Sequence, residues 1–457
     1  MHRLIYLLFF SLLLSCSKSI VEFDGTFAQY QPSIRPSKKE DPVEEKINLD
    51  NLLSLTNLID LALQNNPETK YAWYRAKAAA SRVGLAKSEW YPRIDVRADG
   101  MRLKTFEFLG GPEITDYRAH AGAMLSYLLL DFGERSAAVQ EAKEGLKIAN
   151  WSRDWAMQEV IVKLLSTYYE YLTLKGLFDV ELAAEKEAKE RVQATEQLWE
   201  AGLKSKSDVL AAKSDWTQAK LRLSNKNKNV KIAKAALAKA SGLSIESEIK
   251  VETLPETADP QKITQTFSSF ITEAKKNRAD LLALKAEMAR KHLEIKRVKA
   301  SLWPKIDALA KGGWEYDQKS PSHGIYQYAV GVSLNAPLFN GFKKTYECKR
   351  AYADAQSTLA DVLAKEQTIA FDVFHHFETL KAAQETISLS QESLTYAKEA
   401  YDAALEQYEA GFISIFSLIE LGKILSHARE SKLQANIHWF AEMAQLAYST
   451  GTLLEDL

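Results

Sequence analysis

The sequence predicts a mainly α-helical protein with a smaller β part, built from two tandem copies of one plan. Three observations predict this fold. The chain matches itself at offsets of 212 and 209 residues, each copy holds a very long stretch without proline, and each copy holds segments in which apolar and polar residues alternate. Glycine (19) and proline (11) are scarce in 457 residues, which favours long helices over turn-rich β structure.

The composition is that of a folded protein without a basic surface for nucleic acid. Hydrophobic residues make up 46% of the chain and charged residues 26%, which are ordinary values for globular proteins. The formal net charge is −1, whereas nucleic-acid-binding domains are usually strongly basic. We therefore expect no nucleic acid among the partners.

The N-terminus carries the pattern of a secretory signal. An apolar run over residues 4–14 follows two polar residues, and it is too short to span a bilayer. A serine directly before Cys16 resembles the bacterial lipoprotein processing box, which implies that Cys16 becomes the acylated first residue of the mature chain. The alternative is a plain signal with an incidental cysteine. We expect a signal peptide over residues 1–15 and a lipid-anchored, extended tail over residues 16–55.

The two halves of the chain can be laid over each other. Residues 89–95 (EWYPRID) match residues 301–307 (SLWPKID), and the shared proline, isoleucine and aspartate keep their places. Residues 197–210 match residues 406–419 and share the sequence EAG. Matched proline and glycine landmarks in the same order indicate a tandem duplication. We expect a first repeat over residues 56–242, a linker over residues 243–265 and a second repeat over residues 266–457.

Within each half, the pattern predicts a helix, a β-hairpin, a long helix and a further helix. The helical segments are rich in good helix formers, whereas the hairpin segments alternate with the period of a strand that has one apolar face. We expect helices over residues 57–90, 134–201, 267–302 and 341–410, and helix that resumes after Gly202 and Gly411 and runs to about Gly242 and Gly451. We expect strands over residues 92–108, 117–127, 304–316 and 326–334.

The long helices set the scale of the fold. About 68 residues of helix span about 100 Å, far beyond a compact domain. The two shorter helices of a half together match that length, so we expect them end to end along the long helix, with Gly202 and Gly411 at the far tips. Apolar stripes at helical spacing are expected to form the core: Val160, Leu164, Leu165, Tyr168 and Tyr171, and Ile369, Val373, Phe374, Phe377 and Leu380.

The strands predict a shared barrel if they lie in a membrane. The first strand of each hairpin, with 17 and 13 residues, exceeds the 9–11 that cross a bilayer, but four strands cannot close a barrel. An open sheet in lipid leaves backbone groups unpaired, at several kcal/mol each. Two chains would give eight strands, and three would give twelve, which is wide enough for a passage. If the hairpins do not lie in a membrane, they belong to a soluble domain.

These features in this order resemble the TolC family of outer-membrane factors: the signal and lipid box, the helix, the YP motif, the hairpin, the long helix, the EAG tip and the duplication. The lipidated branch that serves drug-efflux and metal-efflux pumps is the most similar, and the resemblance covers residues 56–453. It implies long helical hairpins that form a trimeric α-barrel, and four strands per chain that contribute to a shared twelve-stranded β-barrel in the outer membrane.

The resemblance also implies a function. The protein is expected to be a homotrimer that is lipid-anchored in the outer membrane and extends into the periplasm, with no cofactor and no enzyme activity. Such a channel is the passive exit duct of a tripartite efflux or secretion system. A periplasmic adaptor protein and an inner-membrane transporter recruit and open it, and outer-membrane lipid surrounds its barrel.

An aperture at the helix tips is a further implication of the resemblance. Family members narrow the tunnel through acidic residues after the second tip glycine, and Glu420 lies nine residues beyond Gly411. Three copies around an axis would bring their Glu420 carboxylates together, which raises the pKa values of these carboxylates and favours the passage of cations. The alternative is that Glu420 is a solvated carboxylate on a helix surface. Ser417 stands where TolC has a second acid, and Tyr408 matches a tyrosine of its closing network. Ile413 replaces the partner arginine of that network.

Glycines are expected to make the tip turns. Gly202 and Gly411 would adopt a left-handed conformation that is costly for other residues. The adaptor would meet the tips at four contact candidates: Leu203, Lys204, Phe412 and Ile413. Four apolar residues near the second turn are expected to be exposed, which favours a covered tip: Phe412, Ile413, Ile415 and Phe416.

Two other classes of function compete with the channel. A periplasmic scaffold lipoprotein would bind partners through the helical hairpins without a pore, and the alternating strands disfavour it. A helical-bundle enzyme would need clustered metal ligands or a catalytic motif. The adjacent His375 and His376 point to different sides of a helix, and the chain has no G-x-S-x-G motif, no phosphate-binding glycine loop and no cysteine pair for zinc.

Overall fold

The computed structural model describes residues 52–105, 114–252, 266–317 and 324–453. Cys16, the expected signal peptide, most of the expected tail and residues 253–265 of the expected linker lie outside the described residues. The elements of the first half are α2 (Leu55–Asn65), α3 (Pro67–Ser88), β1 (Arg93–Thr105), β2 (Ile114–Leu130), α4 (Glu134–Glu200) and α5 (Lys206–Ala240). Those of the second half are α6 (Phe267–Asn277), α7 (Ala279–Ala300), β3 (Lys305–Asp317), β4 (Ile325–Asn335), α8 (Lys343–Glu409) and α9 (Ile415–Thr450).

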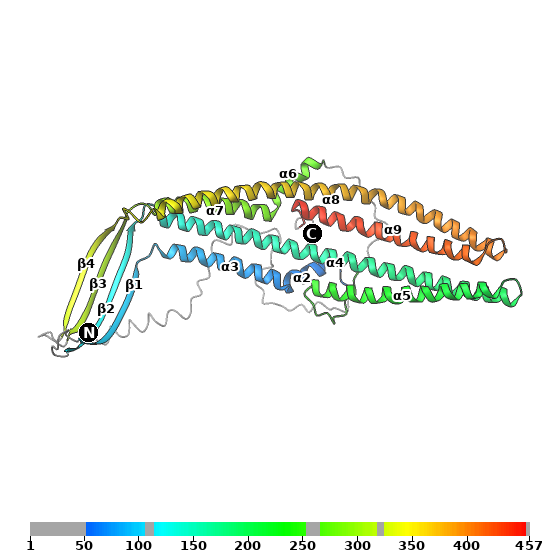
Figure 1. Ribbon diagram of the computed structural model, residues 1–457, viewed down its shortest axis with the longest axis horizontal. Coiled ribbons are helices and arrows are strands. Elements are labelled where there is room, and N and C mark those ends of the chain that lie inside the picture. Colours follow the sequence, from blue (N-terminus) through cyan, green and yellow to red (C-terminus); the bar gives the residue numbers. More distant parts are fainter. Residues whose placement is uncertain (1–51, 106–113, 253–265, 318–323, 454–457) are drawn as a thin grey trace. The chain divides into compact units, whose positions relative to one another are not determined.

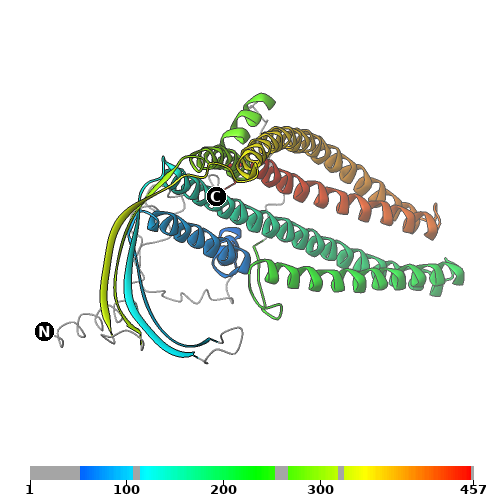
Figure 2. The ribbon, with the colours of Figure 1, turned by 60° about the vertical axis from the view of Figure 1, so that its left-hand side comes forward.

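The two halves have the same order of elements (Figure 1). Helices α4 and α8 each have 67 residues, as expected for the long helices, and α5 and α9 have 35 and 36. Helices α3 and α5 both pack along α4, and α7 and α9 both pack along α8. Figures 1 and 2 show each short pair placed end to end beside its long helix. The predicted arrangement of short and long helices is confirmed.

The first helix of each half is broken in two, contrary to the prediction of one continuous helix. Asn66 separates α2 from α3 with an extended backbone (φ −65°, ψ 128°), and its side chain accepts a hydrogen bond from the N–H of Glu68 at 2.9 Å. Pro67 is the first residue of α3, where a missing N–H costs nothing. Arg278 separates α6 from α7 with similar angles (φ −64°, ψ 114°) and without a proline.

Each helix break packs against the end of the last helix in its half. Gly242 follows α5 with φ 73°, and a Cβ atom on it would lie 2.8 Å from the Cβ of Asn65. Gly451 follows α9 with φ 79°, and a Cβ atom on it would lie 2.9 Å from the backbone nitrogen of Arg278. Both positions therefore require glycine for space as well as for conformation.

The four strands form one antiparallel sheet in the order β1-β2-β3-β4. The predicted strands are confirmed, except that residues 106–108 of the first lie outside the described residues. Strand β2 pairs with β3, so the hairpins of the two halves join into one sheet. One face of β3 and β4 is apolar: Ile306, Ala308, Ala310, Trp314, Tyr326, Tyr328, Val330, Val332 and Leu334. The opposite face is mostly polar or small: Lys305, Asp307, Lys311, Gly313, Glu315, Gln327, Gly331 and Ser333.

The core follows the helices. The apolar stripes of α4 and α8 are buried as predicted, except for Phe374, which is 48% exposed. The ring of Phe374 contacts that of Phe267 in α6 at a centroid distance of 5.5 Å, so it packs beside α6 at the edge of the core. In the described parts of the chain, no helix combines the length and the apolar character needed to cross a bilayer.

Candidate functional site

The candidate site lies at the two helical tips, whose turns have the same geometry. Gly202 follows α4 with φ 78°, and Gly411 follows α8 with φ 86°. The N–H of Leu203 donates to the C=O of Leu198 at 2.8 Å, and the second turn makes the equivalent bond. This pairing ends a helix through a left-handed residue. A Cβ atom on either glycine would meet nothing within 4 Å, so only the backbone conformation favours glycine here.

Serine residues begin the next helix after each turn. The Oγ of Ser205 accepts a hydrogen bond from the N–H of Asp208 at 3.2 Å, and the Asp208 carboxylate accepts one from the N–H of Ser205 at 3.0 Å. The Oγ of Ser414 accepts from the N–H of Ser417 at 3.3 Å, and the two hydroxyls are 3.1 Å apart. Ser417 therefore lies in the first turn of α9, where its side chain contacts the helix cap.

Tyr408 lies between the two helical hairpins. It is 3% exposed, and its hydroxyl is 3.1 Å from Oγ1 of Thr195 in α4. Because the Thr195 hydroxyl already donates to the C=O of Arg191 at 2.8 Å, Tyr408 is the donor to Thr195. The Nζ of Lys204 lies 4.2 Å from the Tyr408 ring centroid and donates to the Tyr408 C=O at 3.3 Å. Burial raises the pKa of Tyr408, so its hydroxyl remains a donor at neutral pH.

A second connection between the hairpins lies farther from the tips, by about one helical turn along α4 and about two along α8. Arg191 of α4 donates from Nη1 to the hydroxyl of Tyr401 in α8 at 3.1 Å, and from Nη2 to Oδ2 of Asp215 in α5 at 2.8 Å. A Cβ atom on Gly422 of α9 would lie 3.3 Å from Cε2 of Tyr401, so this glycine gives the tyrosine room. Burial lowers the pKa of Arg191, but the bonds to Asp215 and Tyr401 outweigh it and raise the pKa above its usual value.

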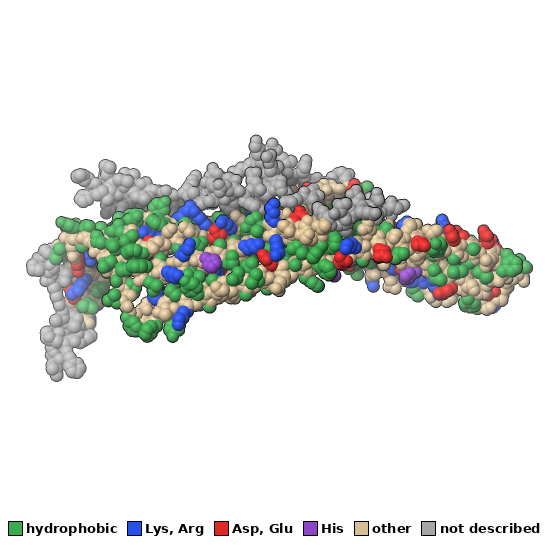
Figure 3. Space-filling view, turned by 90° about the horizontal axis from the view of Figure 1, so that it is seen from above, with side chains coloured by type: hydrophobic (Ala, Val, Ile, Leu, Met, Phe, Trp, Pro, Cys, Tyr) green, Lys and Arg blue, Asp and Glu red, His purple; other side chains and the backbone are tan. Residues whose placement is uncertain are grey.

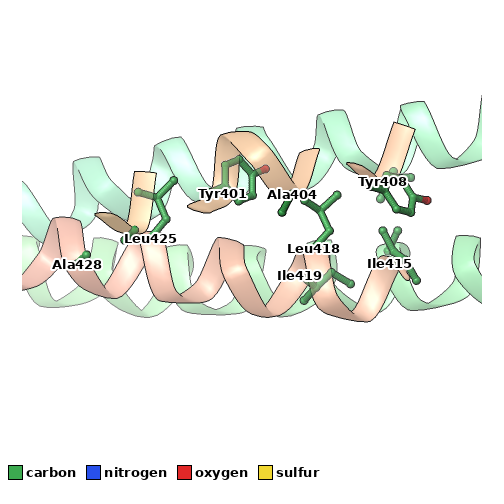
Figure 4. Packing of buried hydrophobic residues seen from close by; sticks show 11 residues of the cluster. Tyr401, Ala404, Tyr408, Ile415, Leu418, Ile419, Leu425 and Ala428 are labelled. Atoms are coloured by element: carbon green, nitrogen blue, oxygen red, sulfur yellow. The ribbon is translucent and has the colours of Figure 1, made fainter. Parts of the chain in front are cut away.

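Apolar side chains fill the space between α8 and α9 near the tips (Figure 4). The members labelled there are Tyr401, Ala404, Tyr408, Ile415, Leu418, Ile419, Leu425 and Ala428. The prediction that Ile415 is exposed is wrong: it is 1% exposed, because Ser414 caps α9 directly before it and the first helical turn carries its side chain inward. Ile413, predicted as an exposed adaptor contact, is half-buried against the same cluster.

Three apolar residues do face outward at the tips. Leu203 is 70% exposed, Phe412 83% and Phe416 65%. Lys204, the remaining contact candidate, is half-buried and lies over the ring of Tyr408. The outward surface of the tips is therefore less apolar than predicted, because Ile413 is half-buried and Ile415 is buried.

Glu420 lies on the exposed side of α9, and its side chain is 66% exposed. Its carboxylate is 3.7 Å from the Nζ of Lys423, one helical turn farther along. Any ring of Glu420 carboxylates would bring the same number of Lys423 ammonium groups with it. The spacing of three residues was a visible signal for this pair, although only the glutamate was predicted.

The sequence-based prediction missed Thr195, Arg191, Asp215 and Tyr401. Arg191 is 24 residues from Asp215 and 210 from Tyr401, and single-sequence spacing gives no signal for contacts at such separations. Within the ranges that the structure describes, no group of three or more His, Cys, Asp or Glu residues is placed to bind a metal ion. The site is thus a set of cross-helix contacts around two turns.

Comparisons with known proteins agree on one family. The sequence profile of the outer membrane efflux protein family matches residues 58–243 and 270–452. The protein CyaE of Bordetella pertussis is 26% identical over 311 residues, which cover 66% of this chain and 64% of CyaE, just under two thirds of its length. The outer membrane channel CmeC of Campylobacter jejuni has a similar fold, with a TM-score of 0.77, 17% identity and coverage of 87% and 86% of the two chains. The outer-membrane channel OprN also has a TM-score of 0.77, with 18% identity and coverage of 87% and 90%.

Proposed function

Because the chain belongs to the outer membrane efflux protein family, we propose that it forms the passive exit duct of a tripartite efflux or secretion system. Three copies would assemble into the duct. A periplasmic adaptor and an inner-membrane transporter would recruit and open it, and the transporter would supply the energy.

The observation that carries this proposal is the incomplete sheet. Its outer strands β1 and β4 each pair on one side only within the described chain. All residues of β4 are exposed, and Tyr326, Tyr328 and Val330 are 86%, 88% and 79% exposed. A sheet with two open edges and an exposed apolar face needs neighbours in lipid, since each unpaired backbone group there costs several kcal/mol. Three copies supply twelve strands, which enclose a passage.

The two faces of the sheet suit a barrel wall. The apolar face would contact outer-membrane lipid. The opposite face, which includes Lys311, Glu315 and Gln327, would line the lumen. Residues alternate between these faces along each strand, as in known membrane barrels.

The helical part supports a continuation of the same tube. The long helices α4 and α8 follow directly after β2 and β4, and each carries two shorter helices along its length. A ring of three copies would extend the barrel as a helical tunnel that ends at the tips. The contacts of Tyr408 and Arg191 would then hold the tips closed, and Glu420 with Ser417 would line the aperture.

The tips would also be the docking surface for the adaptor. Leu203 and Phe412 are exposed apolar residues at the ends of the two hairpins, which favours a protein cover. Lys204 and Ile413, both half-buried, would contribute at the rim. Acylation of Cys16 would add a lipid anchor to the outer membrane.

Single-channel recording on purified outer-membrane material tests this proposal. We expect a species with the mass of three chains that dissociates on heating and conducts in planar bilayers. A monomer without conductance would favour the alternative, a periplasmic scaffold lipoprotein. The Cys16→Ala variant should no longer incorporate labelled lipid, which tests the lipid anchor separately.

A further inference from the structure

Helix α5 presents a basic surface away from its own chain. Its segment 217–240 holds seven basic residues and no acidic one. Arg222 and Lys226 form ion pairs with other helices of the same chain. Lys228, Lys231 and Lys239 are exposed, and within the described residues none of the three has a recorded ion pair.

Helix α8 presents an acidic surface of matching length. Glutamates recur every seven residues on its exposed side: Glu378, Glu385, Glu392, Glu399 and Glu406. A spacing of seven keeps residues on one helical face. Segment 378–409 holds seven acidic residues and two basic ones. Figure 3, which looks down on the side of α8, shows acidic side chains gathering toward the tip end.

These two helices are the opposite edges of the helical layer. Helix α5 packs on α4, α4 on α9, and α9 on α8. Figures 1 and 2 show this order of helices at the tip end. The order matches that of the sheet, in which β1 of the first half and β4 of the second half are the edges. A ring of copies presents one edge to the next copy's other edge, so α5 of one copy would face α8 of its neighbour.

The charges also lie at nearly equal sequence distances from the tip glycines. Lys228 follows Gly202 by 26 residues, and Glu385 precedes Gly411 by 26 residues. Lys220 follows Gly202 by 18 residues, and Glu392 precedes Gly411 by 19 residues. Rotation about an axis parallel to the helices leaves height unchanged, so these residues would meet about 39 Å and about 28 Å from the tips.

Exposed apolar residues accompany the charges on both helices. On α5, Leu221 and Ile232 are each 62% exposed and share a face with Lys228, since spacings of seven and four keep residues on one side. On α8, Leu389 and Tyr396 are 57% and 61% exposed beside the glutamates. Apolar residues flanked by opposite charges are typical of helix pairs that choose their partner by charge.

We infer that α5 of one copy binds α8 of a second copy of this chain, through a lysine surface that faces a glutamate row. This inference rests on the proposed trimer. It identifies the charged contact through which each copy selects and aligns the adjacent copy in the helical part. The interface would weaken with salt, because exposed ion pairs are screened.

Charge reversal with rescue tests the inference. Lys220→Glu with Lys228→Glu on α5, and Glu385→Lys with Glu392→Lys on α8, should each lower the temperature at which the purified trimer dissociates. The four changes combined should restore more than half of the loss, since the pairs re-form with opposite sign. In about 1 M salt, where the Debye length is about 3 Å, the differences should shrink. Rescue also separates a lost contact from a failure to fold.

A matched control is Lys186→Glu with Lys189→Glu on α4, two exposed lysines on a helix that is not an edge. The inference is overturned if the edge variants dissociate at the same temperature as this control. It is also overturned if the dissociation temperature of the four-change variant falls by the sum of the losses in the α5 and α8 variants. It is equally overturned if the trimer is unaffected and only adaptor binding is lost, because the surface then serves another protein. A wild-type monomer without conductance would instead reject the proposed function itself.

Discussion

The hydroxyls of Tyr408 and Thr195 lie 3.1 Å apart although the residues are 213 positions apart in the sequence. Tyr408 belongs to the α8–α9 hairpin and Thr195 to the α4–α5 hairpin. Arg191 and Tyr401 make a second bond between the same hairpins at 3.1 Å. Any movement that separates the two hairpins at the tips must break both bonds, so in the proposed duct these contacts would favour the closed arrangement.

Tyr408→Phe is expected to favour opening. The change removes one hydrogen bond worth about 0.5–1.5 kcal/mol, while Thr195 keeps its bond to the Arg191 C=O. The open fraction in planar bilayers should therefore rise by about two- to twelve-fold while it remains small. Tyr74→Phe is the control, since that exposed tyrosine lies on α3, away from the tips. Equal open fractions in the two variants would show that the Tyr408 bond does not hold the tips.

Glu420 and Lys423 are expected to act in opposite directions on ion selectivity. If both side chains line the aperture, Glu420→Gln removes negative charge and should reduce the preference for cations. Lys423→Gln removes positive charge and should increase it. The reversal potential in a potassium chloride gradient measures both effects. If neither variant shifts the reversal potential, Glu420 does not belong to the aperture.

The glycines that end α8 and α9 are expected to tolerate alanine differently. Both have positive φ, which costs alanine about 1–2 kcal/mol. Gly411 has open space around it, whereas a Cβ atom on Gly451 would lie 2.9 Å from the backbone of Arg278. Gly451→Ala should therefore lower the thermal midpoint of the helical part more than Gly411→Ala, as followed by circular dichroism. An equal loss would contradict the packing of Gly451 on the helix break.

Asp280 is expected to make the helical body sensitive to acid. Burial raises the pKa of Asp280, but bonds from Arg278 and Lys365 outweigh it and hold the pKa below its usual value near 3.8. A lowered folded-state pKa means that the stabilisation is present above the unfolded pKa and is lost as the pH falls through the folded one.

The thermal midpoint should thus fall progressively as the pH drops below about 5, and it should fall less steeply in Asp280→Asn. Asp60→Asn, at an exposed position of α2, is the control and should follow the wild type. Identical pH profiles for wild type and Asp280→Asn would rule out a contribution from this carboxylate.

The fold was predictable where local pattern and tertiary structure agree. Strand alternation, proline-free stretches and the tip glycines are local signals, and they located the strands, the long helices and the turns. The break at Arg278 carries no local signal, because ion pairs from the buried Arg278 to Asp280 and Asp372 and the contact with Gly451 hold it. The other break had a local signal that the prediction did not use, namely Pro67, since proline is favoured at the first position of a helix.

The candidate site was less predictable than the fold. Glu420 and Tyr408 were found by resemblance, and their predicted roles in the aperture remain predictions. Arg191, Thr195 and Asp215 were not found, because a charged or hydroxyl residue within a long helix gives no sign of a partner on another hairpin. Ile415 was wrongly predicted to be exposed. The position of the N-cap residue decides which side of the first helical turn faces the core, and the N-cap is Ser414.

Disulfide cross-linking between sheet edges tests the shared barrel most directly. In a Cys348→Ser background, Val96→Cys on β1 would be combined in turn with Tyr326→Cys, Tyr328→Cys, Val330→Cys and Val332→Cys on β4. Because these side chains share the apolar face, we predict covalent dimers and trimers for the pair that meets across the subunit boundary. If every combination yields only monomers from the outer membrane, neighbouring copies do not join β4 to β1, and the account of a pooled barrel is wrong.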